Sequence, residues 1–304
     1  MEYILKTNSL EKKYKGFAAL NGLTMSVPKG SIYGFVGKNG AGKTTLIRLI
    51  CGMQKPSGGD FELYGVKNTS SKISASRRRM GAVVETPSIY LDMTAENNLK
   101  QQYDVLGMPT YEGIDELLKL VGLTDTGKKM AKNFSLGMRQ RLGIAVALCG
   151  DPDFLVLDEP INGLDPQGII EIRELILKLN RERKITVLIS SHILDELSKL
   201  ATHYGFIDHG RIVRQMSAEE LESACRKCIR LTVTDVKALA MVLDDMGIEY
   251  KVTDDHNADV YASPVLSEIV RKLDKHGCDL ITATERDESL ESYYISLVGG
   301  GSHE

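Results

Sequence analysis

The sequence predicts an α/β protein in which helices wrap a parallel sheet and a smaller α+β domain follows. Between residues 154 and 208, apolar strand-like runs alternate with helix-like runs, which is typical of a parallel sheet. A glycine-rich segment at 37–45 stands between a strand-like run and a helix-like run, as in a phosphate-binding loop. The composition changes near 217–228, and the remainder has a strand and helix order of its own. We therefore expect two domains, at residues 1–220 and 221–304.

Short strand-like runs dominate the chain before residue 94. Five runs bounded by turn residues lie at 3–7, 23–27, 31–36, 57–65 and 80–84. We expect an antiparallel β subdomain among them, beside the parallel sheet. The basic triplet Arg77-Arg78-Arg79 is interpreted as a solvated turn between two strands.

A helical subdomain is expected at about 88–150, inserted between the glycine-rich loop and the rest of the sheet. Apolar residues recur there at helical spacing, and the residues on two such faces are Leu117, Leu118, Val121 and Leu123, then Ile144, Val146, Ala147 and Leu148. The alternating elements that follow are strands at 154–157, 185–189 and 204–208 and helices at 166–179 and 192–200.

The C-terminal domain has the pattern of a ferredoxin-like fold. Its order is β-α-β-β-α-β followed by a helix, with strands at 229–234, 249–253, 258–262 and 279–284 and helices at 236–246, 264–276 and 288–297. Nothing in 229–297 groups acids, histidines or cysteines as a site would. We expect this domain to serve dimer contact or packing.

Composition narrows the classes of function. The chain has 304 residues and a formal net charge of −3, which argues against a protein that binds nucleic acid by neutralising many phosphates. Five cysteines, an odd number, do not suggest a disulfide framework and favour a reducing compartment. Cys225-x-x-Cys228 lacks a second pair and is interpreted as incidental. Since no apolar run approaches about 18 residues, we expect a cytoplasmic protein whose membrane work needs another chain.

The glycine-rich segment has the G-x-x-x-x-G-K-[ST] spacing of a phosphate-binding loop. Its glycines let successive backbone N–H groups face a polyanion, and the helix that follows directs its positive end to the same place. Lys43 is expected to reach the β- and γ-phosphates, and Thr44 to bind Mg²⁺. The residues expected to bind nucleotide here are Gly37, Asn39, Gly40, Ala41, Gly42, Lys43, Thr44 and Thr45.

Two later strand ends carry the remaining catalytic candidates. The apolar run 154–157 ends in Asp158 and Glu159, at the edge of a parallel sheet where ligands bind. Asp158 is expected to hold Mg²⁺ through water, and Glu159 to orient or deprotonate the water that attacks the γ-phosphate. His192 follows the next strand and is a candidate for contacting the γ-phosphate and fixing that water.

Several further motifs follow the phosphate loop in a fixed order. They are Phe134-Ser135-Leu136-Gly137-Met138-Arg139-Gln140-Arg141, Leu157-Asp158-Glu159-Pro160, Asn162-Gly163-Leu164-Asp165 and Ser191-His192. In this order and spacing the chain resembles the ATP-binding cassette (ABC) ATPases over about residues 1–215. The resemblance implies a P-loop NTPase fold, ATP and Mg²⁺ as cofactors, and two nucleotides sandwiched in a dimer, expected to be a homodimer.

The same resemblance assigns roles to four more residues. Ser135 and Gly137, at the start of a helix, would bind the γ-phosphate held by the opposite subunit. Asp165 would cross the dimer seam. Tyr14 stands where the family has an aromatic ring that stacks on adenine, and Phe17 is the competing choice.

Two departures from the family pattern refine the expectation. The usual L-S-G-G-Q has Phe134 and Leu136 in place of its leucine and first glycine, and Glu85 stands where the family normally has glutamine. At that place a residue touches Mg²⁺ and the attacking water, so Glu85 is a further catalytic and metal-binding candidate. Together with the C-terminal domain, these features resemble the bacitracin- and lantibiotic-type transport ATPases. That group pairs with separate permease chains and expels peptide antibiotics, which implies a peripheral position on the cytoplasmic face of the membrane.

Two other functions are weighed against export. Cassette ATPases that act on DNA or ribosomes carry a long coiled coil before the Ser135 segment or two cassettes in one chain, and neither pattern occurs here. A ligand-regulated ATPase switch would depend on the C-terminal domain, whose fold alone assigns no function. The contact with a permease is expected around 86–110, including Pro87, Tyr90 and Met93.

Overall fold

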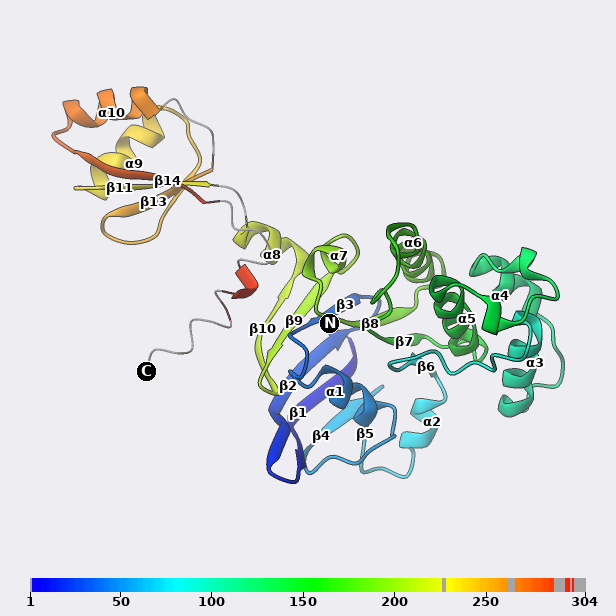
Figure 1. Cartoon of the computed structure of the whole chain (residues 1–304). Helices are drawn as coiled ribbons and strands as arrows, with labels where there is room; N and C mark the ends of the chain where they lie inside the picture. Colours follow the sequence, from blue (N-terminus) through cyan, green and yellow to red (C-terminus); the bar gives the residue numbers. More distant parts are fainter. Residues whose placement is uncertain (1, 226–227, 262–265, 287–292, 296, 298–304) are drawn as a thin grey trace. The chain divides into compact units, whose positions relative to one another are not determined.

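The computed structural model describes every residue except 1, 226–227, 262–265, 287–292, 296 and 298–304. The chain divides into two compact units, Met1–Ala218 and Glu219–Glu304 (Figure 1). The first unit has two sheets and the second unit has one, and each unit has its own core.

The first unit is built on a six-stranded sheet that is parallel except at one edge. Its order is β10-β9-β3-β8-β7-β6, with bounds Arg211–Ser217, His203–Asp208, Ile32–Val36, Thr186–Ser191, Phe154–Asp158 and Met80–Val83. Only β10 runs antiparallel to its neighbour. β3, β7 and β8 are buried at every position because helices and the second sheet cover both faces. The sheet therefore brings the carboxyl ends of three adjacent, rigid strands to one edge.

A second, antiparallel sheet packs beside it in the order β2-β1-β4-β5. Its strands are β1 (Tyr3–Tyr14), β2 (Phe17–Pro28), β4 (Gly58–Leu63) and β5 (Val66–Lys67). The hairpin β1–β2 is longer than the predicted strands at 3–7 and 23–27, because its outer half alternates with polar residues and carries register shifts that hide the pattern. This half brings Tyr14 and Phe17 to the tip of the hairpin.

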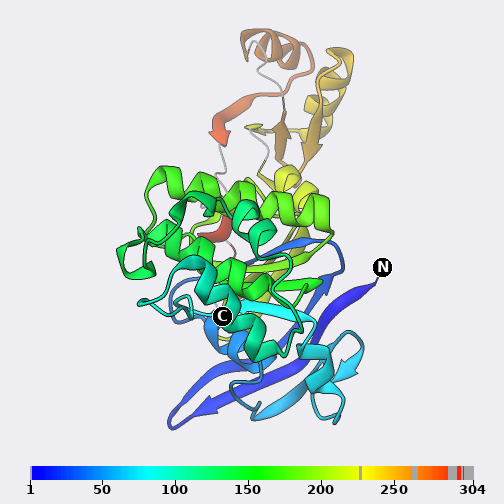
Figure 2. The ribbon, with the colours of Figure 1, turned by 90° about the vertical axis from the view of Figure 1, so that its right-hand side faces the viewer.

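Helices form the rest of the first unit, and Figure 2 faces those of the insertion. The insertion holds α3 (Ala95–Leu106), α4 (Ile114–Leu120) and α5 (Leu136–Leu148), with short 3-10 turns at Thr124–Thr126 and Ala131–Asn133. The remaining helices are α1 (Lys43–Ile50), α2 (Ile73–Arg77), α6 (Pro166–Arg183) and α7 (Leu194–Ser198). Leu117, Leu118, Val121, Leu123 and Ile144 are buried, so both predicted apolar faces contribute to the core.

The basic triplet lies largely in an exposed turn, as the sequence suggests, since Arg78 and Arg79 are exposed turn residues that lead into β6. Arg77 ends α2 and its Nε donates to the Ile50 carbonyl at 2.9 Å. Arg79 stacks its guanidinium 3.9 Å from the centre of the Tyr64 ring and forms an ion pair with Asp153. The turn differs from the prediction in following α2 and not a strand, and the contacts of Arg77 and Arg79 with other elements are ones that a local pattern cannot show.

The second unit has one antiparallel sheet in the order β12-β13-β11-β14. Its strands are β11 (Cys228–Val233), β12 (Tyr250–Val252), β13 (Asn257–Val260) and β14 (Leu280–Arg286), and its helices are α9 (Val236–Asp245) and α10 (Leu266–Lys275). The helix α8 (Ala218–Ala224) lies at the junction. The core joins one face of the sheet to both helices through Leu231, Leu239 and Leu273. Of the predicted last helix at 288–297, residues 288–292 and 296 lie outside the described part.

Candidate nucleotide site

The phosphate loop occupies residues 37–42, between the end of β3 and the start of α1. Gly42 precedes α1 with φ of 112°, and a Cβ there would lie 2.5 Å from the Ala19 carbonyl oxygen. A Cβ on Gly37 would lie 2.6 Å from Cγ2 of Ile207. Both positions therefore require glycine, because neither has space for a side chain. Gly42 also has a backbone conformation that favours glycine. The result is a tight loop whose amides precede a helix N-terminus, the arrangement that binds phosphate groups.

Lys43 is held inside this loop. Its side chain is 5% exposed, and Nζ donates to the carbonyl oxygens of Gly37 at 2.6 Å and of Lys38 at 3.2 Å. Nζ also lies 3.2 Å from Oε1 of Glu159. A nearly buried ammonium group is thus placed in the loop where a polyphosphate would lie.

Asp158 ends β7 and is almost completely buried. Its Oδ1 accepts a hydrogen bond from Oγ of Ser190 at 2.5 Å, whereas its Oδ2 is buried with no hydrogen-bond partner. An unpartnered buried carboxylate oxygen is costly in a folded protein. Such an oxygen fits a hard divalent cation, which prefers oxygen ligands.

Glu159 joins the two halves of the site. Its Oε1 faces Lys43, and its Oε2 lies 2.8 Å from Nδ1 of His192, which follows β8. The backbone of Glu159 is left-handed, with φ of 49°, and its amide donates to Oγ of Ser190 at 3.0 Å. A non-glycine residue seldom adopts this conformation, and such strain is concentrated at functional sites. From this turn the Glu159 carboxylate reaches Lys43 in the phosphate loop.

Lys43 and Glu159 line a hollow of about 330 Å³, whereas Asp158 and His192 are not among its lining residues. Its lining residues are Tyr14, Phe17, Ala19, Asn39, Gly40, Gly42, Lys43, Thr44, Thr45, Arg48 and Glu159. Both aromatic candidates reach it and are exposed, Tyr14 at 41% and Phe17 at 58%. The Tyr14 hydroxyl donates to Oε1 of Gln54 at 2.6 Å. Either ring is thus available to a planar ligand, and only Tyr14 has a partner that fixes its orientation.

Three further predicted residues lie outside this hollow, at the starts of two helices. Oγ of Ser135 accepts from the Met138 amide at 3.2 Å and caps α5, and Gly137 is in the first turn of that helix. Oδ1 of Asp165 accepts from the Gly168 amide at 3.2 Å and caps α6. None of the three lines the hollow of its own chain. This placement is compatible with their predicted contact with a nucleotide on another subunit.

Glu85 also lies outside the hollow. It follows β6, is exposed, and pairs with the guanidinium of Arg48 on α1. In this structure Arg48, and neither Thr44 nor Asp158, is the recorded partner of the Glu85 carboxylate. Sequence reasoning missed Arg48 and Ser190. Both had a signal, since Arg48 is one helical turn beyond Thr44 and Ser190 precedes the Ser191-His192 pair.

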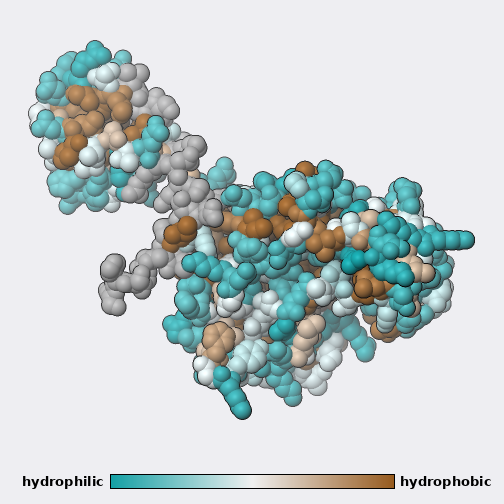
Figure 3. All heavy atoms as spheres, in the orientation of Figure 1, coloured by the Kyte–Doolittle hydropathy of each residue, from teal (hydrophilic) through white to brown (hydrophobic). Residues whose placement is uncertain are grey.

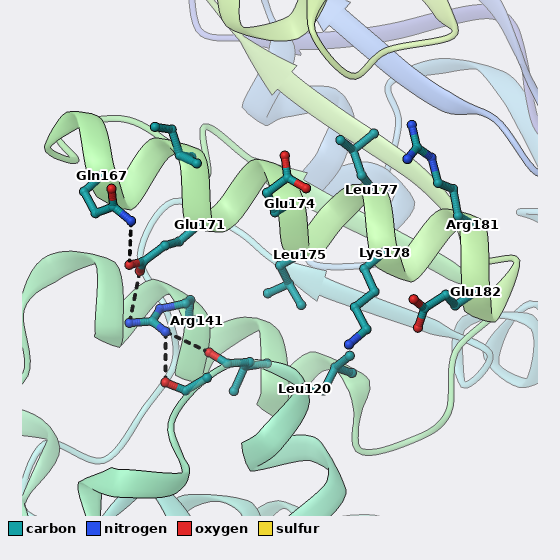
Figure 4. A pocket seen from close by; sticks show the side chains of 13 residues that line it. Leu120, Arg141, Gln167, Glu171, Glu174, Leu175, Leu177, Lys178, Arg181 and Glu182 are labelled. Atoms are coloured by element: carbon teal, nitrogen blue, oxygen red, sulfur yellow. Dashed lines mark hydrogen bonds and ion pairs between the residues drawn. The ribbon is translucent and has the colours of Figure 1, made fainter.

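A larger hollow, of about 630 Å³, lies between α4, α5 and α6 and carries no such chemistry. Figure 4 shows Arg141 reaching across it from α5 to Glu171 on α6. Arg141 also donates to the carbonyls of Val121 and Gly122, each at 3.0 Å. The residues that line this larger hollow include none of the phosphate loop, so we place the nucleotide in the smaller hollow, where that loop is.

Two features are absent from the described residues. In that part of the chain, no group of three or more His, Cys, Asp or Glu side chains is arranged to hold a metal ion. Among the same residues, no helix combines the length and apolar character needed to cross a bilayer.

The fold and the site together define a P-loop nucleoside triphosphatase. The ABC transporter family matches residues 20–162. The bacitracin transport ATP-binding protein BcrA of Bacillus licheniformis is 41% identical over 305 residues, which cover 99% of each chain. The lantibiotic transport ATP-binding protein SrtF of Streptococcus pyogenes is 39% identical over 220 residues, 72% of this chain and 93% of that protein. The cbiO1 structure from Clostridium perfringens superposes with a TM-score of 0.66 at 26% identity, over 81% of this chain and 97% of that one.

The chain therefore belongs to the family of ABC transporter ATP-binding proteins. It is an ATPase, and ATP is its nucleotide. The predicted cassette fold is confirmed.

Proposed function

We propose that this chain is the ATP-hydrolysing subunit of an exporter, and that it drives a peptide antibiotic or a similar amphipathic compound through a separate membrane permease. The observation that carries the chemistry is the Glu159 carboxylate, which bridges Lys43 in the phosphate loop and His192 beyond β8. The two relatives named for bacitracin and lantibiotic transport support the cargo class. The BcrA likeness extends through the C-terminal unit, whereas the SrtF likeness spans 72% of the chain.

The chemistry follows from charges that are already in place. On binding ATP, Lys43 exchanges its loop carbonyls for β- and γ-phosphate oxygens, because a phosphate carries more charge than a carbonyl. Glu159 then accepts the proton of the attacking water, or orients it, while His192 holds the carboxylate in position. Thr44 and the free Oδ2 of Asp158 are the oxygens that would hold Mg²⁺, which supplies charge neutralisation for the phosphates when bound.

The site is completed by a second copy in this proposal. The capped N-terminus of α5, with Ser135 and Gly137, is a ready anion site but lies outside its own chain's hollow. In a homodimer it would contact the γ-phosphate bound by the partner, and Asp165 would lie at the seam. ATP then acts as the ligand that joins two cassettes, and hydrolysis releases them.

Exposed apolar side chains on the helical insertion support contact with a permease. Between residues 90 and 111 of the insertion, six large apolar residues are at least 38% exposed, namely Tyr90, Leu91, Val105, Leu106, Met108 and Tyr111. Figure 3 shows apolar surface over this helical part of the cassette. Soluble proteins seldom expose large apolar side chains in a group. These side chains therefore support a contact with another protein. In this proposal the protein is peripheral on the cytoplasmic face of the membrane.

Transport is tested in a bacitracin-sensitive host that expresses the chain with the membrane proteins that co-purify with it. We expect a higher inhibitory concentration of bacitracin, which Lys43→Ala abolishes without lowering protein abundance. Resistance that Lys43→Ala leaves unchanged would contradict ATP-driven export. Purification with ribosomes or DNA, and with no multi-span protein, would favour the alternative class.

A further inference from the structure

Arg48 links the phosphate-binding helix to the segment that contains Glu85. It lies on α1, five residues after Lys43, and it lines the nucleotide hollow. Its guanidinium donates to Oε1 of Glu85 and forms an ion pair with that carboxylate. Their side chains are 35% and 55% exposed, so the pair lies at the rim of the hollow. The motifs that identify the family include neither the residue nor the pair.

The backbone of Glu85 is held in an unusual conformation. Its φ is 59°, in the left-handed region that a residue with a Cβ seldom occupies. Close packing does not force an exposed loop residue into this conformation. Backbone strain of this kind persists where contacts with neighbouring residues hold the backbone in place. The ion pair with Arg48 is a contact that fixes the carboxylate in this orientation.

The same segment is fixed to α5 on its other side. Pro87 packs so closely on α5 that a Cβ on Gly143 would lie 2.6 Å from Cβ of Pro87. Before Glu85, Gly81 on β6 packs equally closely, since a Cβ there would lie 2.3 Å from the Ala147 carbonyl oxygen. The short segment 84–87 therefore connects α1, through Glu85, with α5, whose N-terminus carries Ser135.

We propose that Arg48 is a positioning residue that neutralises Glu85 beside the nucleotide hollow and couples α1 to α5 through the segment 84–87. The proposal rests on the nucleotide site described above. A carboxylate at the rim of a triphosphate site opposes the bound charge, and a guanidinium beside it cancels that repulsion. The chain thereby tolerates an acid at this place, and the pair holds α1 to the segment that packs on α5.

The first test is a double-mutant cycle on the full chain, with the dissociation constant for ATP measured by calorimetry in Mg²⁺ buffer. Arg48→Gln leaves Glu85 unpaired and is expected to weaken ATP binding about fivefold, the upper range for a partly exposed pair. Adding Glu85→Gln to that variant should restore most of the loss, because the uncompensated charge is gone. Arg48→Lys keeps the charge and should bind within twofold of the unchanged chain.

The second test measures hydrogen exchange of the backbone amides at 84–90 in the nucleotide-free protein. Arg48→Gln should speed exchange there, and Arg48→Lys should not. The matched control is Lys100→Gln, which breaks the ion pair with Glu96 on α3 at similar exposure and should change neither quantity. Equal ATP affinity of Arg48→Gln and the double variant would overturn the neutralising role. Unchanged exchange in Arg48→Gln would overturn the coupling, and failure of the unchanged chain to bind ATP would refute the nucleotide site instead.

Discussion

Glu159→Gln tests the proposed base with the least change of shape. Glutamine keeps the size of the side chain and removes its charge and its ability to accept a proton. A general base contributes about 10²- to 10⁴-fold to a reaction, which corresponds to about 3–5 kcal/mol of activation free energy. We therefore expect turnover of ATP to fall at least 100-fold in the full-length variant, measured as phosphate release under saturating ATP.

The structure also predicts the effect of this variant on ATP affinity. Nζ of Lys43 lies 3.2 Å from the Glu159 carboxylate, where two unit charges attract by about 1 kcal/mol in water and about 5 kcal/mol at an effective dielectric constant of 20. Glutamine removes this competing partner, so Lys43 is freed for the phosphates. ATP binding should stay equal or become tighter, and calorimetry measures it. The control is Glu182→Gln on the exposed face of α6, which should change neither turnover nor affinity.

Two outcomes of the Glu159→Gln experiment would contradict the prediction in different ways. A Glu159→Gln protein that hydrolyses ATP within threefold of the unchanged chain would refute the role of Glu159. Lost ATP binding together with lost turnover would instead show that the carboxylate acts in assembling the loop.

The other predictions concern the loop lysine, the aromatic rim and a partly buried thiol. Lys43→Ala should weaken ATP binding at least tenfold, about 1.4 kcal/mol, in calorimetry, and unchanged affinity would remove Lys43 from the site. Tyr14→Ala should weaken binding of ATP more than Phe17→Ala, because Gln54 holds the tyrosine ring in place; the reverse order in the same titration would favour Phe17 as the adenine partner. Burial raises the pKa of the Cys51 thiol to about 12, with Asp158 adding to the shift and Arg77 opposing it. Its thiolate fraction at neutral pH is thus roughly 1,000-fold below that of an unperturbed thiol, and alkylation of Cys51 by iodoacetamide followed by mass spectrometry should be correspondingly slow until the pH approaches 12.

Local pattern was enough for the parts of the fold whose signals are contiguous. The apolar run 154–157, followed at once by two acids, gives β7, which ends at Asp158. The strand, the phosphate loop and the helix likewise follow one another directly in the chain. The sheet order then places β8 between β3 and β7, so that His192 lies beside Glu159.

Features that depend on distant partners were not predictable in this way. The strand β10 was missed because it is an exposed, largely polar edge strand, whose pairing with β9 defines it more than its own pattern does. The Arg79 guanidinium finds Asp153, 74 residues away, and no local signal marks that contact. The helical spacing from Thr44 marks Arg48 as a residue near the phosphate loop, but it does not show that Glu85, 37 residues away, is its partner.

Nucleotide-driven pairing tests the central claim most directly, because the proposed site takes its last phosphate contact from a second copy. The measurement is the mass of full-length Glu159→Gln in solution with Mg²⁺ and either ATP or ADP, by light scattering after gel filtration. With ATP we expect a mass twice the 33.5 kDa of one chain, and with ADP the mass of one chain. A protein that binds ATP and keeps the mass of one chain at every concentration would contradict the shared site.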